Sequence, residues 1–264
     1  MKHFLATLEY DGTEFAGWQK QPGQRTVQGE LEKVLREVAG IEVATIAAGR
    51  TDTGVHAVGQ AASFSLPGWK SGLDVLVTAL NAKLPLDVSV TGMKGVSAGF
   101  NARRRAVSRL YRYAFLLAPV RSPLLERYAF RVEKRLNIPL MRRVAALFRG
   151  VHDFTAFSRG TDGEKWPSRK VNRCSLTRSG RYLLLDVEAG GFLRHMVRHM
   201  AGAILGAGLG YVDISSVRQA LTGGSRKPTV PMCPANGLAL ISVRFSGGNK
   251  PLNMAFSWPP GRVK

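Results

Sequence analysis

Apolar positions recur with two different spacings along the first 105 residues, and each spacing predicts one kind of element. A helical stripe begins after Thr26, a good N-cap residue, and ends at Gly40, which suits a helix C-terminus. A second helical stripe covers residues 73–80 and stops before Pro85, which cannot continue a helix. Runs of β-branched and other apolar residues predict four strands, at residues 3–10, 41–48, 56–65 and 88–96.

The second half of the chain repeats this order of elements. Helical spacing predicts one helix that starts near Pro139 and another over residues 192–208, and Asp213 is suited to open one further short helix. The dipeptide Ser179-Gly180 is a turn signal between two strands. The predicted strands lie at residues 107–117, 171–178, 182–189 and 238–245.

The order β-α-β-β-α-β, found twice, is typical of the ferredoxin-like fold. We therefore predict an α+β protein of two tandem ferredoxin-like, RRM-like units, whose antiparallel sheets form a central cleft. The first domain is expected over residues 1–105 and the second over residues 106–246. Residues 247–264 are rich in Gly, Pro and Lys, which predicts a flexible tail. Many functions share this fold, so the fold alone identifies none of them.

The charge of the chain indicates what the cleft would hold. Lys and Arg number 38 against 18 acidic residues, which gives a formal net charge of +20 and a sequence pI of about 10.8. A pI above roughly 9 is typical of proteins that bind nucleic acid. Residues 106–264 carry 26 basic and 8 acidic residues, against 12 and 10 in residues 1–105. Because RNA-recognition modules use open antiparallel sheets, we expect an RNA-binding cleft in which the second half of the chain makes most of the contacts with RNA.

Cysteine usage and hydropathy predict where the protein works. Cys174 and Cys233 are far apart and form no C-x-x-C motif, which favours a cytoplasmic protein with reduced thiols. No stretch reaches the roughly 18 apolar residues of a membrane-spanning helix, so no membrane partner is expected. The first ten residues enter a strand pattern directly, without the apolar core of a signal peptide.

Residues 48–57, with the sequence AGRTDTGVHA, carry the groups that most directly suggest chemistry. Asp52 is predicted on a turn between two strands, and the nearby guanidinium of Arg50 should favour its ionised form. Gly49 and Gly54 allow close backbone approach and unusual dihedral angles. An ionised, oriented carboxylate can act as a nucleophile or as a general base. A structural Asx-turn with an Arg–Asp pair also fits the segment, so the segment alone leaves both interpretations open.

Other motifs flank this segment on both sides in a defined order. They are Tyr10-Asp11-Gly12-Thr13, Phe15-x-Gly17-Trp18-Gln19-x-Gln21, Thr26-Val27-Gln28, Asn101-Ala102-Arg103, Arg109-x-Tyr111-x-Tyr113, His152-Asp153-Phe154-x-x-Phe157, Phe192-Leu193-x-His195-Met196-Val197-Arg198 and Pro234-Ala235-x-Gly237-Leu238. Several spaced motifs are together more specific than any one of them. The whole set resembles the tRNA pseudouridine synthase A family over roughly residues 3–246. Its most specific part is the string from Arg50 to Ala57.

The resemblance implies an isomerase that converts uridine to pseudouridine at positions 38, 39 and 40 in the anticodon stem and loop of tRNA. It implies that Asp52 is the catalytic aspartate and that Tyr111 stacks on the target base. It also implies that Arg198 pairs with Asp52 in the cleft, and that Arg50 helps to flip or hold the nucleotide. Members of the family act on tRNA as homodimers without cofactor or metal, and the same is expected here.

Two of these residues also have ordinary structural interpretations. Tyr111 alternates with its neighbours along a strand, a pattern typical of core or surface residues. Arg198 lies in an otherwise apolar helix and needs a partner if it is buried, because an unpaired buried charge costs several kcal/mol. Asp52 is one candidate partner, and Asp186 or Glu188 on the preceding strand are the alternatives.

The helix that carries Arg198 also holds two histidines. His195 and His199 are four residues apart, but the glutamate of an H-E-x-x-H zinc motif is missing, so they are expected to line the cleft or bind phosphate. Two positions depart from the family pattern. Arg104 stands where an aromatic residue commonly follows the Asn101-Ala102-Arg103 triplet, and His199 stands where a small polar residue is expected. Neither touches the Asp52 motif.

Two other functions share parts of this pattern. A non-catalytic RNA-binding protein would explain the charge and the fold class, but it would not explain the turn at Asp52 or an arginine in an apolar helix. An RNP1-type aromatic string, which would favour it, is absent from the sequence. The same chemistry could also be directed at ribosomal or small nuclear RNA, although the chain shows no appended RNA-binding module.

Overall fold

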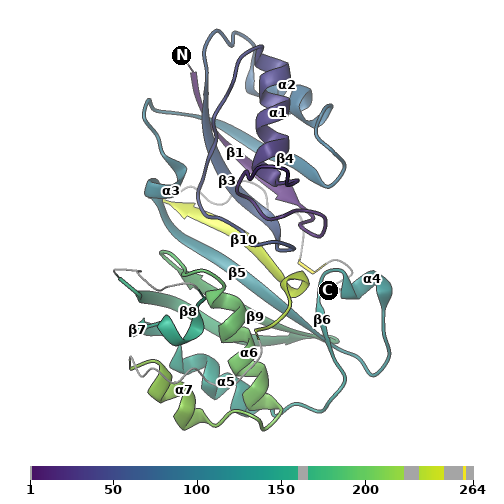
Figure 1. The fold of residues 1–264 in the computed structure, drawn as a ribbon, viewed down its shortest axis with the longest axis vertical. Helices are drawn as coiled ribbons and strands as arrows, with labels where there is room; N and C mark the ends of the chain where they lie inside the picture. The colour runs from purple at the N-terminus through teal and green to yellow at the C-terminus, as the bar shows by residue number, and fades with distance from the viewer. Residues whose placement is uncertain (1, 160–165, 223–231, 247–257, 260–264) are drawn as a thin grey trace. The chain divides into compact units, whose positions relative to one another are not determined.

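The structure is a computed structural model that describes residues 2–159, 166–222, 232–246 and 258–259 (Figure 1). Contacts divide the chain into two compact units. Unit 1 comprises Met1–Arg109 and Leu240–Ser257, and unit 2 comprises Leu110–Ala239 and Trp258–Lys264. Residues 240–246, expected in the second domain, fall in unit 1, where the last strand pairs with the strand of residues 56–66. The tail predicted at 247–264 lies outside the described residues, apart from Trp258 and Pro259.

Unit 1 contains a mostly antiparallel sheet and two main helices. Its strand order is β4-β1-β3-β10, and β2 pairs with β3. The pairings β1–β3, β1–β4 and β2–β3 are all antiparallel, and α1 contacts α2. The elements are β1 (Lys2–Tyr10), α1 (Val27–Ala39), β2 (Ile46–Ala47), β3 (His56–Leu66), α2 (Leu73–Asn81), β4 (Val88–Val96), α3 (Ala102–Arg105) and most of β10 (Leu238–Phe245).

Helix α1 forms where the sequence predicted it, and for the predicted reasons. The hydroxyl of Thr26 accepts a hydrogen bond from the backbone N–H of Gly29 at 3.2 Å, which caps the N-terminus. Gly40 ends the helix in the left-handed conformation, with φ 70°. The apolar stripe, which includes Leu31 and Leu35, is buried. Capping and burial therefore act together on this helix.

Strand β2 is much shorter than the strand predicted at residues 41–48. The carboxylate of Glu32, on α1, accepts hydrogen bonds from the backbone N–H of Thr45 at 2.9 Å and from its hydroxyl at 3.0 Å. The side-chain amide of Gln28 donates to the carbonyl of Thr45 at 3.2 Å. Helix side chains thus satisfy backbone groups that a longer strand would use for its ladder.

The strands of unit 2 follow the order β5-β9-β8-β7, with β6 on β5. The β7–β8 and β8–β9 pairings are antiparallel, whereas β5 and β6 are parallel. Helix α5 contacts α6 and α7. The elements are β5 (Ala106–Leu117, which begins in unit 1), α4 (Pro123–Glu126), β6 (Phe130–Val132), α5 (Ile138–Leu147), β7 (Gly150–Asp153), β8 (Ser168–Ser179), β9 (Tyr182–Ala189), α6 (Met196–Gly208), α7 (Ile214–Ala220) and 3₁₀ turns at Thr155–Phe157 and Ala235–Gly237.

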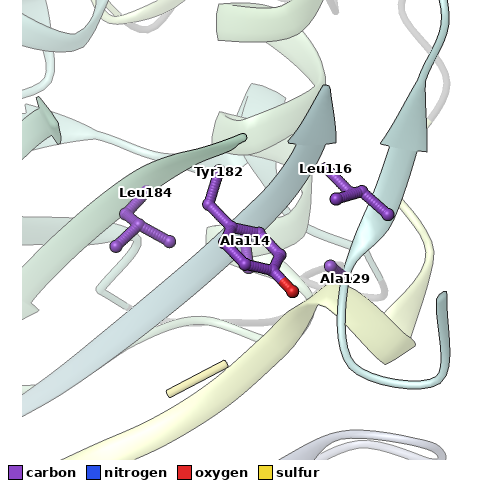
Figure 2. Close-up of a cluster of buried hydrophobic side chains, with 5 residues drawn as sticks. All are labelled: Ala114, Leu116, Ala129, Tyr182 and Leu184. Atoms are coloured by element: carbon purple, nitrogen blue, oxygen red, sulfur yellow. The ribbon is translucent and has the colours of Figure 1, made fainter. Parts of the chain in front are cut away.

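A buried apolar cluster supports β5 and its neighbours (Figure 2). Its members come from β5, β9 and the segment before β6, so it joins parts of the chain that are distant in sequence. The cluster excludes water from the strand that carries the predicted base-stacking tyrosine. It consists of Ala114, Leu116, Ala129, Tyr182 and Leu184.

The α+β class and the mainly antiparallel pairing are confirmed, but unit 2 contains elements that were not predicted. The short elements α4, β6 and β7 span only three or four residues each, too few to show a period. Helix α6 begins at Met196 rather than at 192, because His195 has φ 62° and cannot continue a right-handed helix. No helix in the described parts of the chain is long and apolar enough to cross a bilayer.

Candidate active site

Asp52 lies on the loop that joins β2 to β3, residues 48–55, as predicted. We call this the Asp52 loop. Thr51 and Val55 are buried, Asp52 is half-buried, and Arg50 and Thr53 are exposed. The loop therefore keeps part of its length in the protein interior and leaves Asp52 partly accessible to solvent. Asp52 and Arg50 both belong to unit 1.

A tight turn orders the second half of the loop. The N–H of Val55 donates to the carbonyl of Asp52 at 3.1 Å, and Gly54 between them has φ 76°. A glycine with positive φ at the third position is what a type II turn requires. The conformational role predicted for Gly54 is thus confirmed.

A buried polar network holds the first half of the loop. The hydroxyl of Tyr10 lies 2.8 Å from that of Thr51. The side-chain amide of Gln60 donates to the Tyr10 hydroxyl at 3.4 Å and to the carbonyl of Gly49 at 2.8 Å. Burial raises the pKa of Tyr10 to about 12, partly opposed by the hydrogen bonds from Thr51 and Gln60. The phenol therefore stays neutral and can share its proton with Thr51 throughout the physiological pH range.

Residues 15–18, which follow β1, pack against the Asp52 loop. Gly17 has φ 90°, and a Cβ atom placed on it would lie 2.7 Å from the carbonyl oxygen of Thr51. The N–H of Trp18 donates to that same carbonyl at 3.1 Å, and the N–H of Gly54 donates to the carbonyl of Phe15 at 3.3 Å. Trp18 is buried. The motif is visible in the sequence, but the close approach of the backbone at Gly17 to the backbone at Thr51 is not.

The other two predicted site residues, Tyr111 and Arg198, belong to unit 2. Tyr111 lies on β5 with only 7% of its surface exposed. Its ring meets the ring of Phe192 edge to face, with centroids 5.2 Å apart and an interplanar angle of 86°. This contact fixes the plane of the tyrosine ring and is of a kind worth about 0.5–1.5 kcal/mol.

Arg198, on α6, is half-buried and is joined to the segment before β10. Its Nε donates to the carbonyl of Cys233 at 2.8 Å, and the N–H of Cys233 donates to the carbonyl of Arg198 at 3.2 Å. Asp186, considered as an alternative partner, instead binds Arg112 at 2.6 Å and Arg173 at 2.9 Å. A pairing of Arg198 with Asp52 stays a prediction.

Tyr113 and Gly237 complete the surroundings of Cys233. The hydroxyl of Tyr113 donates to the carbonyl of Pro234 at 2.8 Å, and a Cβ on Gly237 would lie 2.7 Å from the Tyr113 ring. Gly237, which belongs to the last of the sequence motifs, is thus needed for close packing on that ring.

Both thiols should be inert in the folded protein. Cys174 and Cys233 are free and buried, and burial raises the pKa of each to about 12. At pH 8 only about one thiol in 10⁴ is then ionised, and the thiolate is the reactive form. We expect iodoacetamide to modify neither thiol in the native protein and both in guanidinium chloride, as read by mass spectrometry. Fast modification of either native thiol would contradict this assignment.

The two histidines lie at the start of α6. His195 occupies the N-cap position, and the N–H of His199 donates to its carbonyl at 3.1 Å. Within the described residues, no group of three or more His, Cys, Asp or Glu side chains is placed to hold a metal ion.

Comparison with known proteins gives consistent matches. The family model for tRNA pseudouridine synthase matches residues 6–102 and 144–246. The chain is 40% identical to tRNA pseudouridine synthase A of Neisseria gonorrhoeae, over 93% of both chains. It is 40% identical to the Thermosipho melanesiensis protein of that name, over 93% of this chain and 100% of the relative, and 36% identical to that of Shewanella frigidimarina, over 90% and 91%.

Similarity to a solved structure is much weaker. A chain in the crystal structure of a Cbf5-Nop10-Gar1 complex matches 76% of this chain and 54% of that chain, with a TM-score of 0.29 and 14% identity. A likeness of that size supports no inference about this protein.

Proposed function

Because the chain belongs to the tRNA pseudouridine synthase A family, we propose that it modifies uridines 38, 39 and 40 in the anticodon stem and loop of tRNA. It is an isomerase that acts on tRNA uridine. One observation carries the assignment of its catalytic group. Asp52 lies half-buried on a loop that is held by a hydrogen bond between the hydroxyls of Tyr10 and Thr51 and by hydrogen bonds from Trp18 and Gln60 to loop carbonyls.

The reaction needs an oriented carboxylate more than any other group. The N1–C1′ bond of uridine breaks, the base turns over, C5 bonds to C1′, and the hydrogen of C5 leaves as a proton while N1 gains one. No electrons are exchanged, so the reaction needs no redox partner. Asp52 acts as nucleophile or as general base, and both roles require an ionised group aimed at the nucleoside.

The target base must leave its stack before the carboxylate can reach the sugar. Extruding a base costs a few kcal/mol. Stacking of a base on an aromatic ring is worth about 1–3 kcal/mol, so Tyr111 would offset part of that cost. Its edge-to-face contact with Phe192 supports this role because it holds the ring in one plane.

Two arginines complete the proposed site. The Nε of Arg198 donates to the carbonyl of Cys233, and the pairing of its guanidinium with Asp52 is proposed from the family resemblance. Arg50 is exposed, two residues before Asp52 in the sequence, and would help to flip or hold the nucleotide.

The remaining features of the proposal follow the family resemblance. The two units would be tandem ferredoxin-like modules with a central RNA-binding cleft. The protein would work in the cytoplasm as a homodimer, without cofactor or metal. The excess of 26 basic over 8 acidic residues in 106–264 supports contact between this half and tRNA phosphates.

Mapping the product tests the proposed target. Unmodified tRNA with uridines at 38, 39 and 40 is incubated with the protein, labelled with a carbodiimide that marks pseudouridine, and read by primer extension. We expect stops at these positions and none in a matched transcript with cytidines there. Stops confined to other positions would contradict the proposed target while leaving the isomerase class intact.

A further inference from the structure

Arg109, near the start of β5, is a buried cation whose role the sequence motif did not reveal. Only 7% of its surface is exposed. Its Nε donates to the carbonyl of Ala48 at 3.1 Å, and Nη2 donates to the same oxygen. Nη1 donates to the carbonyl of Ala106 at 3.2 Å, and Nη2 also donates to that of Arg103 at 2.9 Å. A single guanidinium thus gathers three backbone carbonyls of unit 1.

Ala48 is the point at which the Asp52 loop leaves β2. Its N–H donates to the carbonyl of Ala61 on β3 at 2.7 Å, and its carbonyl accepts from Arg109. Both backbone polar groups of this residue are therefore held. The chain that continues to Asp52 starts from a fixed point, and the Tyr10–Gln60 network fixes it again at Gly49 and Thr51.

The chemistry of the contact favours arginine. Hydrogen bonds from a charged donor are stronger than neutral ones, and the planar fork can direct two N–H groups at one oxygen. A buried charge is on its own weak support for stability, because desolvation offsets most of the gain. A loop that must orient a catalytic group can need such a contact even where the contact adds little net stability.

We propose that Arg109 is a positioning residue for the isomerisation. Its guanidinium holds the carbonyl of Ala48 and thereby fixes the loop that carries Asp52. This inference rests on the proposed catalytic role of Asp52. It assigns Arg109 no contact with the substrate, so its loss should lower kcat and leave KM for tRNA nearly unchanged.

The test compares Arg109→Gln and Arg109→Lys with wild type and with Arg36→Gln. Arg36 is an exposed arginine of α1, paired only at the surface with Glu42, and its replacement removes the same charge from unit 1. Release of tritium from 5-tritiated uridine in tRNA gives kcat and KM. Circular dichroism shows at which temperature every variant is folded, and the kinetics are measured below it.

We expect Arg109→Gln to lower kcat about 10²-fold, the scale of a misplaced catalytic group, with KM within about threefold of wild type. Arg109→Lys, which can still donate to one carbonyl, should have a kcat about tenfold higher than that of Arg109→Gln. Arg36→Gln should match wild type. Hydrogen exchange should become faster in peptides that cover residues 48–55 in the glutamine variant and stay unchanged in the rest of unit 1.

Several outcomes would overturn the inference. They are a folded glutamine variant with kcat within twofold of wild type, a rise in KM at constant kcat, and unfolding of both Arg109 variants. If only the glutamine variant fails to fold, the kcat of the lysine variant decides. Absence of tritium release from wild type would instead refute the proposed function, so the two failures are distinguishable.

Discussion

Asp52→Asn is expected to abolish isomerisation while the affinity for tRNA stays within about tenfold of wild type. The amide has nearly the same shape as the carboxylate but can act neither as a nucleophile nor as a base at neutral pH. The contacts that hold the backbone of the loop involve Thr51, Gly54 and Val55, so its fold should survive the change. The charge changes by one on a protein of net charge +20.

Asp74→Asn provides the matched control for this prediction. Asp74 is an exposed carboxylate in the first turn of α2, also in unit 1, and its replacement changes the net charge equally. Single-turnover kinetics measure the chemistry, and filter binding at fixed salt measures affinity. The control should retain wild-type turnover. An Asp52→Asn protein with turnover within tenfold of wild type would refute the assigned role.

The second large effect is expected for Gly17→Ala. A Cβ at this position would lie 2.7 Å from the carbonyl oxygen of Thr51 and 3.1 Å from the carbonyl carbon of Asp52. Either residues 15–18 or the Asp52 loop must move, and overpacking of this kind costs about 1–3 kcal/mol of stability. A shift of about 1 Å at the carboxylate should lower kcat about 10²-fold.

Gly23→Ala separates this displacement from backbone strain. Gly23 also has a positive φ, 67°, but a Cβ there meets no atom within 4 Å. Its replacement should cost about 1–2 kcal/mol through the left-handed conformation alone, with kcat unchanged. Thermal unfolding and steady-state kinetics on both variants test the pair. Equal loss of kcat in both variants would show that the packing of Gly17 against the Asp52 loop does not position the loop.

Local patterns in the sequence were sufficient for most elements of the fold. Helix α1 was predicted with both caps because Thr26 and Gly40 act on their own neighbours. The length of β2 was not predictable, since the carboxylate of Glu32 removes Thr45 from the ladder and that contact depends on tertiary structure. The start of α6 was missed because the positive φ of His195 leaves no signal in the hydrophobic pattern.

Some features of the candidate site were also predictable from local sequence, and others were not. The position of Asp52 between two strands followed from the residues around it, and so did the turn at Gly54. The supports of the loop did not, because the bond from Arg109 to Ala48 joins residues 61 positions apart. The Arg109-x-Tyr111-x-Tyr113 motif indicated that this arginine matters, but not what it binds. The roles of Tyr111 and Arg198 remain predictions from the family resemblance.

Release of tritium from 5-tritiated uridine in unmodified tRNA is the decisive measurement for catalysis by Asp52. C5 loses its hydrogen only when it becomes the carbon joined to C1′, so release reports the isomerisation itself. We expect release by the wild-type protein and none by Asp52→Asn, although both bind tRNA. Binding without release by either protein would instead indicate a non-catalytic RNA-binding protein, and release by both would remove the chemistry from Asp52.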